Sequence, residues 1–465
     1  MTTEERKNTA DLQQLQERGH INQKNASVST LADSLKALDK FGGFQLFKGL
    51  VKGLDNMDPR RKAAKSIYLS ESKYEESRNK LKEELQIWLD TIDGEHEDAQ
   101  EIIDACQKKK NLAEENLSLN LNNIRSDISD LEKAYRSLDS FFANAGQGKI
   151  DCLTLANIDK SELGSFKSAD SEFIQRNVHD EYDDISLRGH YSLLVLPGYL
   201  GDADNVRQWG KFAYDNKVLL VTDFEDSSLY DDFDELKNAI ENAYLQGQDT
   251  YMSHVLMTCN YLLGRKKSEM ANEDEDLYIP GSAALAGKMS NVNETVISQG
   301  IAGVKYGTLD NVKGARLNLR KSELTALINL GVIPMIESEG RTIAFSNRTL
   351  YSGGTDLLQE YPIVRVFDWI GKEFQHFFDG ETFRNWSNNT QSELKEAIHV
   401  FLSSQKGTGR LIDNYRLNGV ERDKNTGDIS IQVELKPFFA SRNYLIELKG
   451  HQDENSLNTF SQDIR

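Results

Sequence analysis

The chain has 465 residues, of which 38% are hydrophobic, 9% are aromatic and 28% are charged. This length exceeds what one ordinary core needs and predicts two or three structural units, while the apolar content excludes a wholly disordered chain. Acidic residues outnumber basic ones by 74 to 55, and the resulting formal charge of −19 repels nucleic acids and anionic lipids. Nucleic-acid binding is therefore not expected.

Cysteine spacing and hydropathy indicate the compartment. Cys106, Cys152 and Cys259 lie far apart and form no CxxC pair, which argues against a disulfide framework and against a zinc site. No apolar run approaches the roughly 18 residues of a membrane span, and the polar start lacks the apolar centre of a signal peptide. We expect a cytoplasmic protein without direct membrane insertion.

The first part of the chain changes character near residue 30. Residues 1–30 are polar and predict a flexible arm. Next, Phe44, Phe47 and Val51 recur at helical spacing before Pro59 ends the pattern. This segment is interpreted as a short helix docked on the body or on a neighbouring subunit, in preference to a membrane-surface helix.

Residues 72–143 carry heptad patterns. A first seam comprises Leu81, Leu85, Trp88 and Ile92. A second seam with alternating spacings of four and three comprises Leu117, Leu121, Ile124, Ile128, Leu131, Tyr135, Leu138 and Phe142. The Asp93-Gly94 pair predicts a turn between them. The pattern predicts helices that pack on each other or on a partner, and it favours neither an ordinary bundle nor an intermolecular coiled coil.

From about residue 150 onward, strands and helices alternate. Apolar runs within 191–198 and 217–224 predict buried strands, with a helix between them. Further along, a helix that stops at Gly331 precedes two predicted strands. Two strand-like runs close to the end of the chain are separated by a break at Pro437. The fold class indicated is α/β with mixed sheets.

Two glycine-containing segments invite a nucleotide-binding interpretation. In 277–290, Gly281 and Gly287 are separated by five residues instead of the four of a P-loop, and Met289 replaces the magnesium-binding Ser or Thr. The turn at Gly198 lacks the full G-x-G-x-x-G motif, and two nearby aspartates would repel a pyrophosphate. No cofactor is therefore expected.

Catalytic patterns are scarce. The eight histidines are dispersed, without an H-E-x-x-H motif, and no G-x-S-x-G motif occurs. Carboxylates are so abundant that many acid–base pairs could be suggested, so their presence does not indicate catalysis. A solvated surface explains their number better. We expect neither an enzyme nor a metal site.

The order of segments then resembles a known family. The successive stretches "YIPGSAALAGKMS", "LRKSELTALINLGVIPMIESEGRTIAFSNRTL" and "VRVFDWIGKEFQHFFDGETFRNWSNNTQSELKEAIHVFL", followed by paired terminal strands, resemble contractile tail-sheath proteins. Within that superfamily they resemble the large sheath subunit of type VI secretion systems, called TssC or VipB. A strand and helix at "IDCLTLANIDKSEL" fit the same order. The resemblance covers about residues 150–455; residues 1–145 match poorly, which implies a divergent branch.

The resemblance implies a mechanical role. Such a subunit pairs with a small sheath subunit (TssB/VipA-like), stacks with copies of itself in a helical lattice around an Hcp-like inner tube, and contracts after a baseplate trigger. A ClpV-like AAA+ unfoldase dismantles the contracted form. The alternatives are a homomeric phage-tail-like or other injection-system sheath, a coiled-coil scaffold, and a nucleotide-dependent enzyme. Residues 281–290 would then be a turn in the packed body, where small residues allow close approach.

The implied organisation has four parts. A flexible polar arm spans 1–30, a helical region with the heptads 31–145, an α/β sheath core 146–360, and an inner sheath domain with C-terminal linking strands 361–465.

Two sets of residues are expected to make contacts between subunits. The first is a strand that completes a sheet shared between protomers, or else an ordinary intramolecular strand: Tyr444, Leu445, Ile446, Glu447 and Leu448. The second is a charged cluster about a break at Gly380 that faces the tube: Lys372, Glu373, Asp379, Glu381 and Arg384.

Overall fold

The computed structural model describes residues 66–92, 99–146, 150, 152–269, 273, 275–291, 296–423, 425–441, 446–451 and 459–464. The chain divides into two compact units, Met1–Asn123 and Ile124–Arg465, which are treated separately below. The expected polar arm and the expected short helix before Pro59 lie outside the described residues.

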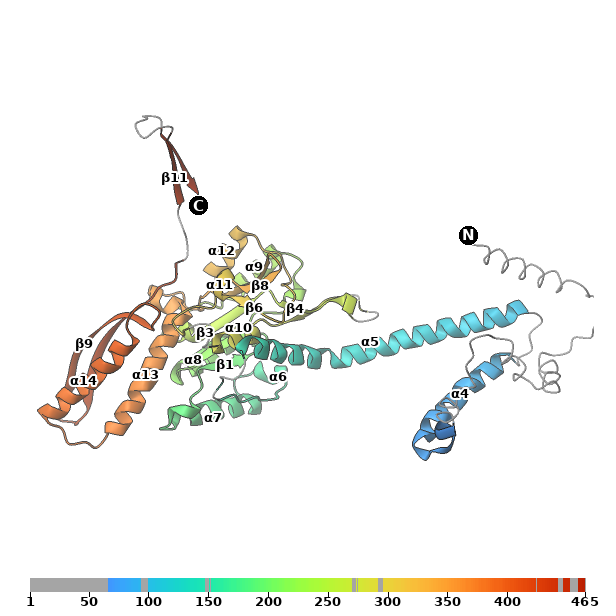
Figure 1. Ribbon diagram of the computed structural model, residues 1–465, viewed down its shortest axis with the longest axis horizontal. Coiled ribbons are helices and arrows are strands. Elements are labelled where there is room, and N and C mark those ends of the chain that lie inside the picture. Colours follow the sequence, from blue (N-terminus) through green and yellow to red (C-terminus); the bar gives the residue numbers. More distant parts are fainter. Residues whose placement is uncertain are drawn as a thin grey trace, which may run out of the picture. The chain divides into compact units, whose positions relative to one another are not determined.

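The first unit is helical where it is described, as the heptad patterns predict (Figure 1). A short 3-10 helix, η3 (Ser72–Tyr74), leads into α4 (Glu75–Ile92). Helix α5 (Ala99–Ala145) follows and continues into the second unit. The predicted turn at Asp93-Gly94 lies outside the described residues.

The second unit is built on a six-stranded mixed sheet in the order β1-β2-β3-β7-β8-β6. Its strands are β1 (Leu193–Leu196), β2 (Leu219–Asp223), β3 (Val255–Cys259), β6 (Thr308–Leu309), β7 (Ile333–Ser338) and β8 (Arg341–Ala344). The first three pair in parallel and β7 joins β3 in parallel, whereas β8 is antiparallel to both β7 and β6. The predicted strand-helix-strand unit is confirmed, with α8 (Ala203–Asp215) between β1 and β2.

Both faces of this sheet are covered, because successive side chains of a strand point to opposite faces. In β2, Leu220 belongs to one core cluster, while Leu219 and Val221 belong to the other. The first cluster gathers apolar side chains of α7 (Ala169–Asp183), α8, α9 (Phe233–Asn242) and α12 (Lys321–Asn329). The second gathers α10 (Ser282–Ser290) and the end of α5.

Shorter elements complete the body. They are α6 (Lys160–Leu163), α11 (Gly303–Tyr306), the antiparallel pair β4 (Leu262–Arg265) and β5 (Leu277–Ile279), and the 3-10 helices η4 (Leu187–Gly189), η5 (Ser227–Leu229), η6 (Thr250–His254), η7 (Lys267–Glu269) and η8 (Asp356–Gln359). Helix α12 stops as predicted at Gly331, whose φ of 78° suits glycine. The strand predicted before α6 is wrong, because residues 152–158 form no strand.

The remainder of the second unit has a core cluster of its own. Helices α13 (Tyr361–Glu381) and α14 (Asn388–Gln405) form a hairpin and share this cluster with the antiparallel strands β9 (Ile412–Arg422) and β10 (Ile429–Pro437) (Figure 1). The expected break between two helices is present but begins just after Gly380, since α13 continues to Glu381. A further antiparallel pair comprises β11 (Ile446–His451) and β12 (Thr459–Ile464). No described helix has both the length and the hydropathy needed to cross a bilayer.

Candidate interaction surfaces

The glycine-containing segment at 281–290 forms a buried helix, α10, and not the expected turn. A helix N-terminus is a ready anion site, because its first amides lack partners. Here Asp223 occupies that place: its carboxylate accepts from the Ser282 amide at 2.8 Å, from the Gly198 amide at 2.8 Å and from the hydroxyls of Ser282 and Thr258. The anion position is therefore filled from within the chain.

Burial and hydrogen bonding act on Asp223 in opposite directions. The side chain is fully buried, and this desolvation raises the pKa of the carboxyl above its usual range. The donors from Gly198, Ser282 and Thr258 favour the ionised form and offset part of that shift. The arrangement ties the ends of β2 and β3 to α10, so it belongs to the packed body.

Small residues allow α10 to approach α5. A Cβ atom on Gly287 would lie 2.2 Å from the carbonyl oxygen of Phe141. Ala283, Ala284 and Ala286 are buried beside it. The close approach expected of this segment is confirmed, although it is made by a helix.

The second-unit part of α5 presents an apolar seam to solvent. The seam consists of side chains that are 38–71% exposed: Ile124, Ile128, Leu131, Tyr135, Leu138 and Phe142. On the opposite face, Ser140, Phe141, Asn144 and Ala145 are buried. Asn144 exchanges two hydrogen bonds with the backbone of Asp310, at 2.8 and 3.0 Å. The helix is thus attached by one face, and the seam is left available.

An ion network fixes the orientation of α5. The Arg265 guanidinium donates to both carboxylate oxygens of Glu132, at 2.7 and 3.1 Å, and also contacts Glu273. Arg136 donates to the same Glu132 at 2.8 Å. The bond from Arg265 holds the pKa of Glu132 below its usual range. Bidentate pairs of this kind restrict geometry, so the seam faces a defined direction.

The five charged residues expected to face the tube lie in different environments. Lys372 is buried and its Nζ donates to the carbonyl oxygen of Tyr191 at 2.8 Å; burial lowers the pKa of this lysine to about 8. Its ammonium is therefore directed into the chain. Asp379 is exposed and Glu373 is half-buried. Near the end of α13, Arg384 donates to Glu381 at 2.7 Å and also contacts Glu393 of α14.

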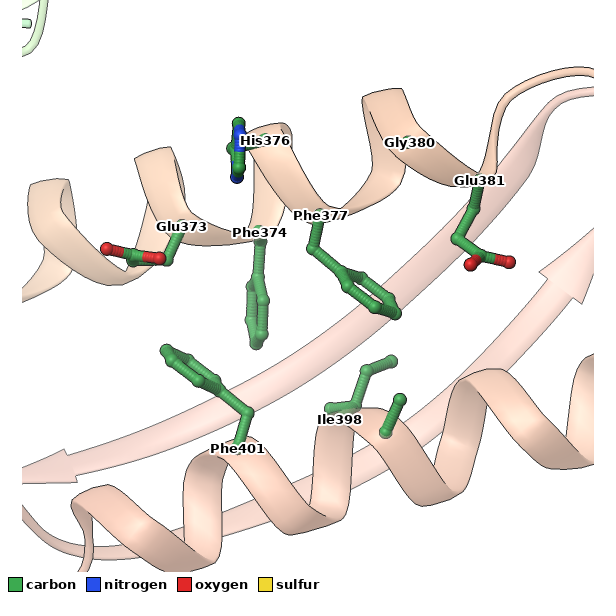
Figure 2. A pocket seen from close by; sticks show the side chains of 9 residues that line it. Glu373, Phe374, His376, Phe377, Gly380, Glu381, Ile398 and Phe401 are labelled. Carbon is green, nitrogen blue, oxygen red and sulfur yellow. The ribbon is translucent and has the colours of Figure 1, made fainter. Parts of the chain in front are cut away.

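A groove of about 450 Å³ lies between α13 and α14. Figure 2 shows Phe374 and Phe377 of α13 pointing toward Ile398 and Phe401 of α14. Glu373 and Glu381 lie at opposite ends of this apolar group, whereas His376 points away from it. The turn after α13 carries Phe383, which is fully exposed and which the sequence patterns did not single out. Its only signal in the sequence is an aromatic residue in a polar turn.

The strand-forming end of the chain supplies two hairpins. In β9 and β10, alternate side chains reach the core under α14, among them Tyr415, Leu417, Ile431 and Val433. Residues 446–448 of the predicted inter-subunit strand lie in β11, which pairs within the chain with β12. Tyr444 and Leu445 lie outside the described residues. Strand formation is confirmed, and sharing between protomers stays a prediction.

One buried group resembles a catalytic triad in composition. Ser253 Oγ lies 3.0 Å from His254 Nδ1, and His254 Nε2 lies 2.9 Å from Asp368 Oδ2. Ser253 is fully buried and His254 is 3% exposed, so a substrate does not reach the hydroxyl in this conformation. Within the described ranges, no three His, Cys, Asp or Glu side chains are placed to hold a metal ion.

Comparison with known protein families identifies the family of this chain. The central domain of type VI secretion system TssC/VipB proteins matches residues 123–352, and the TssC/VipB-like C-terminal domain matches 360–463. The TssC/VipB-like N-terminal region matches 31–121, a part for which the sequence motifs implied a poor match. The chain belongs to the TssC/VipB family.

Several solved structures are similar to this chain, and the first one named here shares its fold. The helical sheath of the anti-feeding prophage in its contracted state is 18% identical, with a TM-score of 0.50 over 69% of this chain and 82% of that one. A chain of the baseplate of the same prophage is 18% identical, with a TM-score of 0.49 over 68% and 80%. The contracted sheath complex of an extracellular contractile injection system is 17% identical, with a TM-score of 0.47 over 69% and 81%. Among curated proteins, none matches the chain.

Proposed function

We propose that this member of the TssC/VipB family is the large sheath subunit of a type VI secretion system. The observation that carries the proposal is the succession of three TssC/VipB matches, which together extend from residue 31 to residue 463. The subunit would assemble in the cytoplasm with a small sheath subunit into a tubule around an Hcp-like tube. A baseplate would trigger contraction, and a ClpV-like unfoldase would dismantle the contracted form.

The proposed stroke is mechanical and involves no bond chemistry. Its work would come from the free-energy difference between two lattices of the same folded subunits, multiplied over many copies. The buried environment of Ser253 and the filled anion site at Asp223 support a non-enzymatic role.

Negative-stain microscopy of the chain co-expressed with its candidate small subunit tests the proposal. Tubules that form only with both proteins support it. Tubules formed by this chain alone would indicate a homomeric injection-system sheath instead. Small discrete particles that hydrolyse ATP would contradict both.

The seam on α5 supports the proposed pairing with a small subunit. A row of large apolar side chains along one helix face is the surface that a partner helix covers. We expect the large subunit alone to be poorly soluble and the small subunit to rescue it. A stable, monodisperse monomer produced without any partner would count against this pairing.

The terminal strands support a link between copies. A two-stranded sheet leaves main-chain donors and acceptors along its outer edges, which a strand from another chain can pair. We propose that β11 completes a sheet shared with a neighbouring protomer. Truncation after Ser441 would leave the body and the small-subunit complex folded while abolishing long tubules. Tubules of normal length from that truncation would refute the link.

The hairpin of α13 and α14 is the proposed contact with the tube. Partly exposed charge pairs contribute about 0–1 kcal/mol each, which suits a contact that must be released along the whole sheath. Because Lys372 is buried, the proposal depends on Glu373, Asp379, Glu381 and Arg384. Reversing the three carboxylates to lysine should give sheaths that are empty or already contracted. Reversed sheaths that enclose the tube and fire normally would place the contact elsewhere.

A further inference from the structure

The junction between the body and α13 contains a buried histidine whose neighbours determine its protons. His254 ends η6, and its ring lies between Ser253 of the same turn and Asp368 of α13. Its Nδ1 atom lies 3.0 Å from the Ser253 hydroxyl, and its Nε2 atom lies 2.9 Å from Asp368 Oδ2. Both ionisable side chains are largely buried. The ring therefore takes its polar contacts from the protein.

The Ser253 hydroxyl fixes the state of Nδ1. A serine hydroxyl has one proton, and Ser253 Oγ lies 2.6 Å from the carbonyl oxygen of Thr250, an atom that can only accept. The serine proton is therefore donated to Thr250. Toward the histidine the serine oxygen can then only accept, so His254 Nδ1 carries a proton.

The second ring nitrogen also faces an acceptor. Neither His254 Nε2 nor Asp368 Oδ2 makes an aligned hydrogen bond to any described residue, although the two atoms are 2.9 Å apart. Two lone pairs at this distance would repel each other, so a proton lies between them. Because Nδ1 is already protonated, this second proton makes the ring an imidazolium or makes Asp368 a neutral acid.

The charges around the ring favour the imidazolium form. Lys372 lies one helical turn after Asp368, and its positive charge stabilises the Asp368 carboxylate, which leaves the second proton on the histidine. The ring of Tyr214 packs edge-on against His254, with the two centroids 5.0 Å apart. Further ionisable groups near this junction are the exposed Asp356 of η8, Tyr182 of α7 and Lys217 beyond α8.

We propose that His254 and Asp368, with the proton between them, form a pH-sensitive latch that attaches α13 to the body. When His254 gives its Nε2 proton to the solvent, the neutral ring turns a lone pair toward the Asp368 carboxylate, and the contact becomes repulsive. The bond from Lys372 to the carbonyl oxygen of Tyr191, at 2.8 Å, is kept, so α13 opens more often but stays attached. This regulation goes beyond the proposed function, because it needs only the folded chain.

The direction of the pH effect follows from counting protons. A histidine in water has a pKa of about 6.5, so above this value the open form holds one proton fewer than the latched form. Opening therefore becomes easier as pH rises, by at most about tenfold per pH unit. Between about pH 6 and about pH 7.5 we expect the frequency of opening to rise about tenfold. Lys372 keeps most of its charge over this range, since burial lowers its pKa only to about 8.

Nitrogen-15 NMR of the full chain labelled at histidine tests the protonation directly. Solid-state spectra can be recorded from sedimented chain as well as from assemblies, and His254→Gln identifies the signals of His254. At about pH 6 the ring of His254 should show two protonated nitrogens. In Asp368→Asn, whose amide can donate to Nε2, it should show one unprotonated nitrogen. His376, which is exposed on the same helix, is the reference and should be alike in both proteins.

Hydrogen–deuterium exchange tests the opening of α13. After correction for the intrinsic pH dependence of exchange, the first half of α13 should open about tenfold more often at about pH 7.5 than at about pH 6. His254→Gln keeps a donor near the Nε2 position, so α13 should stay closed at both values. His254→Asn keeps a donor only near the Nδ1 position, so α13 should open readily at both. The buried helix α10 should exchange alike in all three proteins, which excludes global unfolding as the cause.

The outcomes separate the latch from the proposed function. An unprotonated His254 Nε2 in the wild-type chain at about pH 6 would overturn the latch. Equal opening of α13 at both pH values, or a pH dependence that persists in His254→Gln, would overturn it as well. Neither measurement requires tubules, so a failure to form tubules would refute the proposed function while the latch is judged by these results.

Discussion

Phe141 and Phe142 are neighbours on α5 and meet opposite environments. Phe141 is 8% exposed and its carbonyl oxygen packs on Gly287 of α10, whereas Phe142 is 48% exposed and ends the apolar seam. The buried face of α5 meets small residues and polar caps from its own unit. The exposed face carries large apolar side chains that remain 38–71% exposed. The buried face of α5 thus packs through close backbone approach, whereas the exposed face offers the large side chains of the seam.

The buried face should be the most sensitive to change. In Gly287→Ala, the new Cβ would meet the Phe141 backbone, so α5 and α10 must separate. We expect the free energy of unfolding to fall by about 3 kcal/mol. Urea unfolding of the complex with the proposed small subunit measures this. Gly371→Ala is the control, because a Cβ there meets nothing within 4 Å; it should be neutral or stabilising by up to about 1 kcal/mol. Equal changes in the free energy of unfolding for Gly287→Ala and Gly371→Ala would contradict the importance of the close contact between α5 and α10.

The buried ammonium group of Lys372 should make the free energy of unfolding depend on pH. The pKa of Lys372 is lowered from 10.5 to about 8 by burial, so the unfolded chain binds more protons than the folded chain between these values. The free energy of unfolding should rise by about 2–3 kcal/mol as pH increases from 8 to 10.5, and this gain should be lost again as pH falls from 10.5 back to 8. Lys372→Met should abolish that slope. A slope that survives the substitution would assign it to other groups.

Substitutions in the apolar seam of α5 should weaken binding to a partner and leave the stability of the fold nearly unchanged. Leu131→Glu removes an apolar side chain that is 71% exposed. Because this side chain is mostly exposed, we expect its replacement to change the free energy of unfolding by less than about 0.5 kcal/mol. Affinity for the proposed small subunit should fall about thirtyfold, or about 2 kcal/mol. Ser126→Glu, at an exposed position between seam residues, serves as the control in the same titration. Unchanged binding by Leu131→Glu would leave the seam without its proposed partner.

The smallest effect concerns an exposed aromatic outside the seam. Tyr244 has a strained φ of +48° and 76% exposure. Tyr244→Asn should raise the free energy of unfolding by about 0.5–1 kcal/mol, because asparagine adopts this backbone at lower cost. Thermal melting detects such a change. Destabilisation would indicate that the tyrosine makes a contact worth more than its strain.

Much of the fold is predictable from local pattern. The runs "YSLLVLPG" and "KVLLVTDF" are short and apolar, as strands buried on both faces must be, and they form β1 and β2. The stop of α12 at Gly331 follows from backbone preference alone. Residues 152–158 carry apolar side chains as a strand does, but they form no strand, and none of the described strands pairs with them.

The interaction surfaces are less predictable, because they depend on distant contacts. Proximity in the sequence suggests that Lys372 and Glu373 act together, but helical geometry turns the two side chains in different directions, and Lys372 donates to the carbonyl of Tyr191. Strand β9 is polar on one face, so its sequence alone does not indicate a strand, and its pairing with β10 is what defines it. Phe383 needed its φ and its exposure, neither of which a letter pattern reveals.

The two faces of α5 also restrict how this stretch of the chain can change in length. Each residue of an α-helix advances the direction of its side chain by about 100°. One residue inserted between Ile124 and Phe141 would rotate everything before it relative to the face that packs on α10, and the seam would be divided between two sides of the helix. Substitutions that preserve size are compatible with both faces, but insertions and deletions are not. Aligned relatives should therefore show variable residues and a constant length across this stretch, with gaps falling outside it.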